Sequence, residues 1–337
     1  MFGGTWKIPI AEGSQDPSVI ENVKLSDTYS PESFDREYNS KWYGDAEDAF
    51  FSNEIIKEAR QLYIPHLKYQ LRPRADKDCF YVIGVDVGRT HCTTEITVVL
   101  VRPRNDYSMT SIKEVVNIIT VPETDFEQQA KIIKKAFFNY NARAVAIDAN
   151  GLGIGLIDFM TKAQKDPQTG TVLKGFGVCD SLPTSVADQY KDKKGEDFIE
   201  GAMFLCKFNA QLNSDHYAYM QSQFSNHKLK LLVGEKDAKE NLLRTKEGRA
   251  MTLSDRNDYL QPFVQTTSLE SQLLNLKREM DSKAVTITLK QSSTLVLKDK
   301  FSSLLYALAY IKTWEDGRTT HKKKINVEDL LLFGQLS

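Results

Sequence analysis

The sequence predicts an α/β protein with a mixed β-sheet, in which the first three strands are antiparallel, the fourth is parallel to the first, and helices flank the sheet. Three observations lead to this prediction. Residues 79–86 form an apolar run without polar alternation, as expected for a strand buried on both faces. Two more strand-like segments follow, joined by turn residues. A helix, a short apolar strand and another helix come next, and this order puts the fourth strand beside the first.

The composition is that of an ordinary globular protein, with 41% hydrophobic and 26% charged residues among 337 and a net charge of -1. No apolar run is long enough to span a bilayer, and no signal-peptide core begins the chain, so we expect a cytoplasmic protein with no membrane partner. A near-neutral charge still fits a nuclease, because acids around a metal offset a basic groove. The four cysteines are Cys79, Cys92, Cys179 and Cys206. They form no CxxC pair, which indicates reduced thiols and no zinc site.

We divide the chain into an N-terminal segment (1–75), a main domain (76–320) and a tail (321–337). The N-terminal segment should contain loops, a helix that opens at Ser30-Pro31, and a second helix over 53–62. Its charged, proline-containing end leads into the main domain.

The main domain continues with elements of clear periodicity and then with weaker ones. The clear ones are strands at 93–101, 112–121 and 143–148, with helices at 125–140 and from 153 to about 163. The weaker ones are strands at 173–179, 228–233 and 284–289, helices at 204–224, 269–280 and 299–314, and a charged loop at 188–197.

Acidic residues end two of these strands and open the last helix. Asp86 ends the first strand and Asp148 the fourth, so the two carboxylates should lie at one sheet edge, where open α/β sheets bind ligands. Asp299 begins the final helix, where the helix dipole favours a carboxylate. Each alone is explained by a turn or a helix cap. Together they favour a site for Mg²⁺ or Mn²⁺, which prefer oxygen ligands.

Such a site suits phosphodiester hydrolysis. Three acids can bridge two ions roughly 4 Å apart, one activating the attacking water and the other stabilising the leaving 3′ oxygen. The histidines show no metal-ligand spacing: His66, His91, His216, His227 and His321.

At these residues the chain resembles the nuclease domain of the terminase large subunit of tailed bacteriophages, a ribonuclease H-like fold. The matching motifs are IGVDVGR at 83–89, AIDANGLG at 146–153 and KDKFSSLLYALAYI at 298–311. SPESFDREY at 30–38 and GDAEDAF at 44–50 resemble the stretch that joins the ATPase and nuclease domains of that family.

The resemblance implies an endonuclease that cuts concatemeric double-stranded viral DNA during genome packaging in the host cytoplasm. Asp86, Asp148 and Asp299 would be its catalytic, metal-binding acids, with two Mg²⁺ or Mn²⁺ ions as cofactors. The portal and the small terminase subunit would be its partners.

Two features depart from the family pattern. No GxxxxGK[ST] motif occurs in the sequence, so we expect no ATP hydrolysis and a fragment, a separately made piece or a split-gene product. Many members also carry a further acid beside or one turn after the third position, where this chain has Lys300, Ser302 and Ser303.

Arg89, Lys298 and Lys300 flank the predicted metal site and are the best candidates for contacts to DNA phosphates. The basic stretch 226–256 fits a groove rim and a solvated surface equally well. Nothing resembles a base-reading module, so we expect little base specificity.

Three alternatives stay open. A sugar-kinase or actin-like phosphotransferase would share the phosphate hairpin at 86–90, but the second hairpin of that class is missing. Another ribonuclease H-like nuclease, of the transposase or resolvase type, would share the acids. A non-catalytic DNA-packaging or motor-docking module would use them structurally.

Overall fold

The computed structural model describes residues 10, 13–14, 16–25, 34, 49–88, 93–104, 110–150, 153–179, 190, 197–279 and 286–333, with side chains in the last helix as far as Arg318. The helix predicted from Ser30 lies outside these residues except for Phe34, and so does most of the charged loop at 188–197. None of the described helices is both long and apolar enough to cross a membrane.

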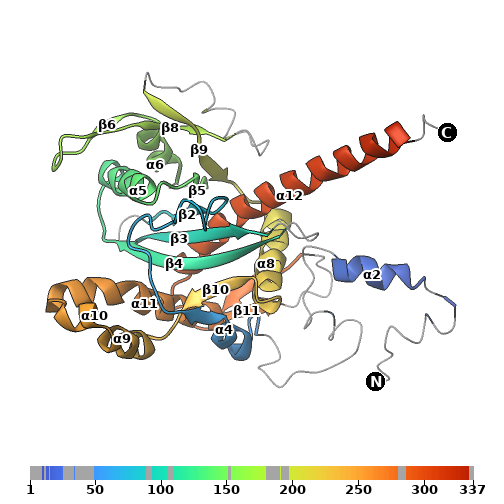
Figure 1. Cartoon of the computed structure of the whole chain (residues 1–337), viewed down its shortest axis with the longest axis horizontal. Coiled ribbons are helices and arrows are strands. Elements are labelled where there is room, and N and C mark those ends of the chain that lie inside the picture. Colours follow the sequence, from blue (N-terminus) through green and yellow to red (C-terminus); the bar gives the residue numbers. More distant parts are fainter. Residues whose placement is uncertain are drawn as a thin grey trace.

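An eight-stranded mixed sheet forms the centre of the molecule, in the order β1-β10-β4-β3-β2-β5-β9-β8 (Figure 1). β2, β3 and β4 are antiparallel neighbours, and β5 runs parallel to β2, which confirms the predicted fold class. The strands of this sheet are β1 Arg60–Leu62, β2 Phe80–Asp86, β3 Thr94–Pro103, β4 Ser111–Val121, β5 Ala144–Asp148, β8 Gly175–Val178, β9 Phe198–Cys206 and β10 Leu229–Leu232.

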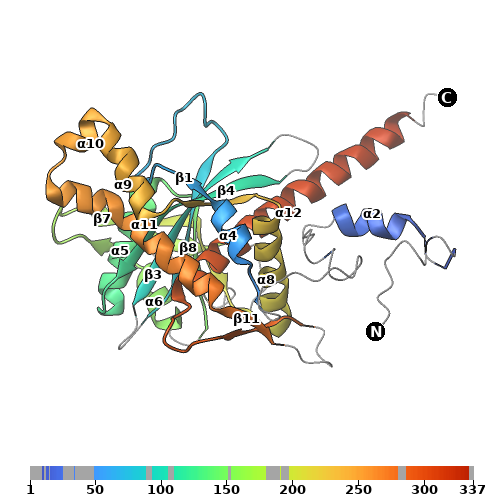
Figure 2. The same ribbon diagram turned by 90° about the horizontal axis from the view of Figure 1, so that it is seen from below.

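Helices cover both faces of the sheet, because the side chains of the central strands are apolar on both sides. On one face, α5 (Phe126–Tyr140) and α6 (Gly153–Met160) pack against a core that includes Tyr81 and Ile83. On the other, α8 (Ala210–Ser225), α11 (Leu253–Leu274) and α12 (Asp299–Phe333) pack against Phe80 and Val82 (Figures 1 and 2).

α12 lies directly on β2 and β3, and a glycine permits this contact. A Cβ atom added to Gly84 in β2 would lie 1.9 Å from the backbone oxygen of Ser303 and 2.8 Å from the nitrogen of Ala307. Only a residue without a side chain lets the helix backbone approach this closely. The glycine therefore sets how near the start of α12 lies to the end of β2.

Shorter elements complete the fold. The remaining helices are α2 Ser18–Leu25, α4 Asn53–Ala59, α9 Glu235–Arg244 and α10 Lys246–Ala250. Two small antiparallel pairs lie outside the main sheet: β6 Gln164–Lys165 with β7 Val172–Leu173, and β11 Leu276–Glu279 with β12 Thr288–Gln291.

Several predicted elements were wrong or misplaced in the second half of the chain. The helix predicted from 204 begins only at Ala210, because Phe204 belongs to β9, which inserts between β5 and β8. The helix predicted over 269–280 is the end of α11 followed by β11. Between the strand predicted over 228–233 and the helix predicted from 269, where no element was predicted, the chain forms α9, α10 and most of α11. These elements are fixed by long-range pairing that a local pattern does not contain.

Other differences concern boundaries. The helix predicted over 53–62 ends at Ala59, and β1 replaces its last turn and joins the sheet beside β10. The strand predicted over 284–289 is β12, slightly later in the chain. The final helix was predicted to end at 314, but α12 continues to Phe333 and extends beyond the sheet (Figure 1).

Candidate functional site

Two of the three predicted acids end neighbouring parallel strands. Asp86 is the last residue of β2 and Asp148 the last residue of β5. Val85 pairs with Ile147, so the next residues, the two aspartates, lie at the same level of the sheet. Asp86 is two residues beyond Gly84 and therefore shares the sheet face that α12 covers. Both carboxylates stand at the carboxyl edge of the sheet on that face.

The third acid comes to the same edge from the other end of the chain. Asp299 is the first residue of α12, whose first turn contacts β3. The Nζ atom of Lys300 lies 2.7 Å from Oε1 of Glu95, and Glu95 is the residue opposite Asp86 in the β2–β3 register. The fold thus brings Asp86, Asp148 and Asp299 together.

Burial and, for two of the three acids, nearby negative charges raise the pKa of their carboxyl groups. Burial, and then the negative charges of Asp299 and Asp148, raise the pKa of Asp86 to about 8. Burial also raises the pKa of Asp148, partly offset because Asn150 donates to Oδ1 from its backbone at 2.9 Å and its side chain at 3.0 Å. For Asp299, burial and the charge of Glu95 raise the pKa. The charged form of each of these carboxyl groups is therefore disfavoured.

One oxygen of Asp299 makes no hydrogen bond with the described residues and could bind a cation. Its Oδ2 atom is buried and has no hydrogen-bond partner among the described residues. Leaving a buried carboxylate oxygen unpaired is costly, and a hard divalent cation would satisfy it.

The donor chemistry therefore fits such an ion. Within the described part of the chain, however, no group of three or more His, Cys, Asp or Glu side chains is arranged so that it could hold a metal ion. What the fold supplies is a set of converging carboxylates rather than a completed coordination shell.

A fourth acid, Glu95, escaped the sequence analysis. It is the second residue of β3, its side chain is 2% exposed, and it raises the pKa of both Asp86 and Asp299. The alternation of Thr93, Glu95 and Thr97 in an otherwise apolar strand was the available signal. Its significance depends on the register with β2, which no local pattern reveals.

The predicted DNA contacts have different outcomes. Arg89 lies outside the described residues. Lys298 is exposed beside the acids, and its charge lowers the pKa of Asp86 and Asp299. Lys300 is 7% exposed and its ammonium group is held by Glu95, so it offers no charge to a DNA backbone. This burial and pairing disfavour the predicted DNA contact by Lys300.

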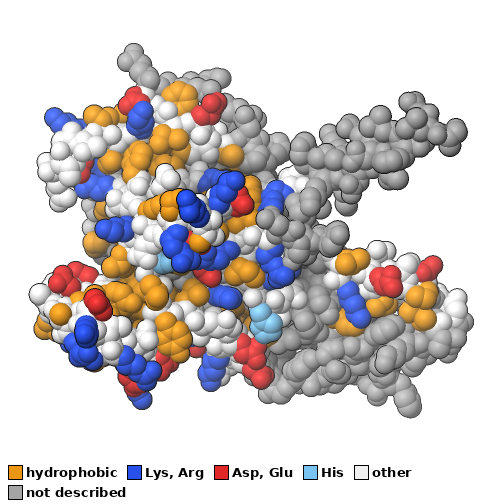
Figure 3. Space-filling view, viewed as in Figure 1, with side chains coloured by type: hydrophobic (Ala, Val, Ile, Leu, Met, Phe, Trp, Pro, Cys, Tyr) orange, Lys and Arg blue, Asp and Glu red, His pale blue; other side chains and the backbone are white. Residues whose placement is uncertain are grey.

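The basic stretch 226–256 is not a uniform positive surface. α9 carries three basic and three acidic residues. Figure 3 shows the two kinds of charge interspersed over the lobe that α9 and α10 form. This mixture favours a solvated surface over a phosphate-binding rim.

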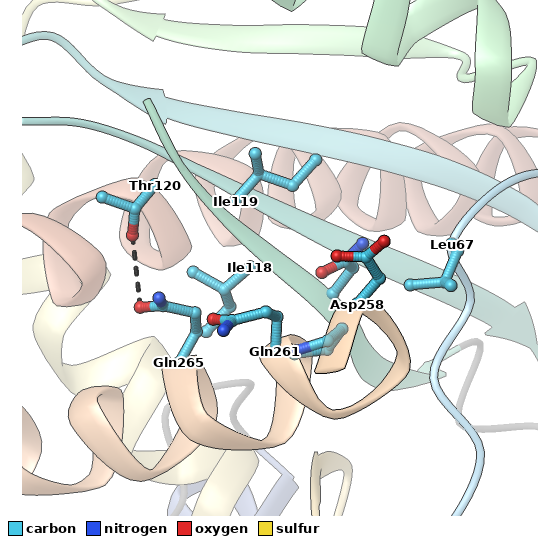
Figure 4. Close-up of a pocket in the computed structure, with 9 residues that line it drawn as sticks. Leu67, Ile118, Ile119, Thr120, Asp258, Gln261 and Gln265 are labelled. Carbon is cyan, nitrogen blue, oxygen red and sulfur yellow. Dashed lines mark hydrogen bonds between the residues drawn. The ribbon is translucent and has the colours of Figure 1, made fainter. Parts of the chain in front are cut away.

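A cavity of about 260 Å³ lies between β4 and α11, two strands away from the strand that carries Asp86 (Figure 4). Its lining contains a single carboxylate, from Asp258. Thr120 connects the two places, because it lines the cavity beside Gln265 and its hydroxyl lies 2.8 Å from Oε2 of Glu95. The cavity is therefore a neighbour of the acidic edge and not the acidic site itself.

Solved structures similar to this chain are large terminase nucleases. The nuclease from thermophilic phage G20c with bound magnesium is 11% identical, with a TM-score of 0.43 over 78% of this chain and 98% of that one. The nuclease domain from Thermus phage P74-26 is 10% identical, with a TM-score of 0.39 over 77% and 94%. The nuclease domain of gp2 from bacterial virus Sf6 is 11% identical, with a TM-score of 0.37 over 79% and 97%.

These are the proteins that the sequence motifs resemble. No family model matches the sequence, and no curated protein matches it.

Proposed function

We propose that this protein is a metal-dependent endonuclease that cleaves double-stranded DNA by phosphodiester hydrolysis, with Asp86, Asp148 and Asp299 as its catalytic, metal-binding acids. The observation that carries the proposal is the convergence of these carboxylates at one sheet edge. They come from β2, β5 and α12, and Oδ2 of Asp299 lacks a partner among the described residues. Holding like-charged carboxylates close together costs free energy unless a cation neutralises them.

Divalent ions, Mg²⁺ or Mn²⁺, would supply charge neutralisation of the phosphate and activation of water. The chain contributes the rest. Asp86 is held by the rigid centre of the sheet, and Asp148 is oriented by the two hydrogen bonds from Asn150. Asp299 presents its unpaired oxygen from the start of α12, which can lie close to β2 because residue 84 is a glycine. Lys298 would contact a DNA phosphate from the exposed start of α12, and Arg89 is proposed for the same role.

The biological setting extends the proposal through the resemblance. It would be the cutting of concatemeric viral DNA during genome packaging in the host cytoplasm, with the portal and the small terminase subunit as partners. We keep residues 76–320 as the proposed nuclease domain, with the addition that α4 and β1 of the preceding segment pack on its sheet.

Cleavage of supercoiled plasmid with Mg²⁺, with Mn²⁺ and with EDTA tests the function. We expect nicked and linear products only with metal, and none from Asp148→Ala, whose circular dichroism should match that of the parent. Asp237→Ala, which alters an exposed acid on α9, is the matched control and should cleave normally.

Parent-level cleavage by Asp148→Ala would rule out the mechanism. DNA binding by the parent without cleavage under any metal would favour the non-catalytic packaging module instead.

A further inference from the structure

Polar side chains from two other elements hold the first turn of α12. Oε1 of Gln272, on α11, accepts hydrogen bonds from the backbone nitrogens of Lys300 at 2.9 Å and Phe301 at 3.1 Å. These nitrogens have no partner within the helix, so Gln272 acts as its N-terminal cap. From β3, the hydroxyl of Thr97 lies 2.7 Å from that of Ser303. Ser303 is fully buried.

The strongest of these contacts is a buried ion pair. The Nζ atom of Lys300 donates to Oε1 of Glu95 at 2.7 Å, and the two side chains are 9% and 2% exposed. The hydroxyls of Thr93, at 3.0 Å, and Thr120, at 2.8 Å, donate to the two oxygens of the same carboxylate. Glu95 is thus satisfied by protein groups, in contrast to Asp299.

The location of this pair gives it significance. Glu95 is the cross-strand partner of Asp86, and Lys300 is the chain neighbour of Asp299. The ion pair therefore links the strand that carries one acid to the helix that carries another. A shift of the first turn of α12 would change the separation of the two carboxylates.

Stability alone does not explain such a pair. Removing two charges from water costs about as much as their attraction returns, and apolar replacements of similar size are often as stable. A buried pair instead restricts the geometry, because any displacement leaves charges unpaired.

We propose that Glu95 and Lys300 are positioning residues for the metal ligands, which fix the first turn of α12 so that Asp299 stands at the correct distance from Asp86. Gln272 supports the same turn. The inference rests on the proposed function, because it requires that the acids bind metal.

The test is the double variant Glu95→Gln/Lys300→Met. It removes one negative and one positive charge, so the net charge beside the site is unchanged and no buried charge is left unpaired. A change in metal affinity then reports position rather than charge. The control is Lys113→Met, which breaks another buried Lys–carboxylate pair, at 2.8 Å to Glu315, far along the same helix.

Mn²⁺ binding by calorimetry and by the metal-induced rise in Tm gives a readout independent of cleavage. The Mn²⁺ concentration for half-maximal plasmid cleavage gives a second. We expect the double variant to fold and to need roughly 10- to 100-fold more Mn²⁺ than the parent, as for the loss of other groups that orient metal ligands. Saturating Mn²⁺ should restore most of the cleavage. Lys113→Met should keep the parent's Mn²⁺ dependence in every assay.

Equal Mn²⁺ dependence in the double variant, the control and the parent would overturn the positioning role while leaving the proposed function intact. A parent protein that neither binds Mn²⁺ nor cleaves would overturn the proposed function itself. Gln272→Met is the second variant. It leaves the ion pair in place and should weaken Mn²⁺ binding in the same direction, and no change would count against a positioned first turn.

Discussion

In the part of α12 whose side chains are described, Glu315 is buried and Asp299 is half-buried, and the fold treats the two carboxylates in opposite ways. Glu315, near the end of the part that packs on the sheet, accepts from the Ser111 backbone nitrogen at 2.7 Å and hydroxyl at 2.5 Å. Lys113 donates to it at 2.8 Å and Tyr219 at 2.6 Å. Asp299, at the start of the helix, keeps Oδ2 buried and without a partner among the described residues.

The difference separates a structural anchor from a proposed metal ligand. A carboxylate with every oxygen satisfied holds elements together and has no reason to bind anything else. One that is buried yet unsatisfied stores unfavourable free energy, which a cation can release. Two carboxylates on one helix therefore differ: Glu315 holds elements of the fold together, and Asp299 has an oxygen that is free to accept a cation.

If Glu315 is an anchor, its loss should affect stability and not cleavage. Glu315→Gln removes the charge that Lys113 and three other donors face, and breaking a buried pair costs roughly 3–5 kcal/mol. Urea denaturation should show a loss in that range. Below the lowered Tm, cleavage per folded molecule should equal that of the parent. A selective loss of cleavage would make Glu315 part of the site and end the distinction.

Gly84 tests how closely the site depends on helix position. Gly84→Ala places a Cβ atom against the backbone of Ser303, so α12 must shift, at a cost of about 2–3 kcal/mol. The shift should also raise the Mn²⁺ concentration needed for cleavage. The control is Gly317→Ala on the same helix, where a Cβ atom meets nothing within 4 Å.

That control should stabilise the protein by roughly 0.5–1 kcal/mol and leave the metal dependence unchanged. If Gly84→Ala loses stability with no change in metal dependence, the first turn of α12 does not need a fixed position.

The smallest expected effect is on pH dependence. Burial and its acidic neighbours raise the pKa of Asp86 from 3.8 to about 8, so between these values the metal-free folded protein binds a proton that the unfolded chain has lost. Its free energy of unfolding should therefore fall as pH rises from about 4 to about 8.

Asp86→Asn removes this titration. At pH 8 in EDTA it should be more stable than the parent, on the order of 1–2 kcal/mol, and near pH 4 the difference should vanish. Melting curves at both pH values measure it. A variant less stable than the parent at pH 8 would mean that Asp86 is not under electrostatic strain.

The sequence was sufficient where the signal is local. β2 and β5 are short apolar runs that end in aspartate, and their order along the chain predicts their parallel pairing. α12 opens on Asp299 with apolar residues at helical spacing. These three elements carry the candidate acids, and so the acids were identified without coordinates.

The rest depends on contacts between distant residues. In β9, Gly201 has a φ of 65° and interrupts the strand pattern, and Pro262 lies inside α11, where it disfavours a helix prediction. Gln272 is an ordinary glutamine until α12 is seen to begin beside it. Lys300 looked like a surface cation because Glu95, 205 positions earlier, could not be paired with it from sequence.

The long stretch of chain between Glu95 and Lys300 also affects when the acidic edge can form during synthesis. During synthesis, Asp86 and Asp148 leave the ribosome long before Asp299, which begins the last described element of the chain. A nascent chain can begin to pair its strands, but it still lacks Asp299 and also Lys300, the ion-pair partner of Glu95. Under the proposed function, copies that stop before α12 would lack Asp299 and would therefore leave surrounding DNA uncut.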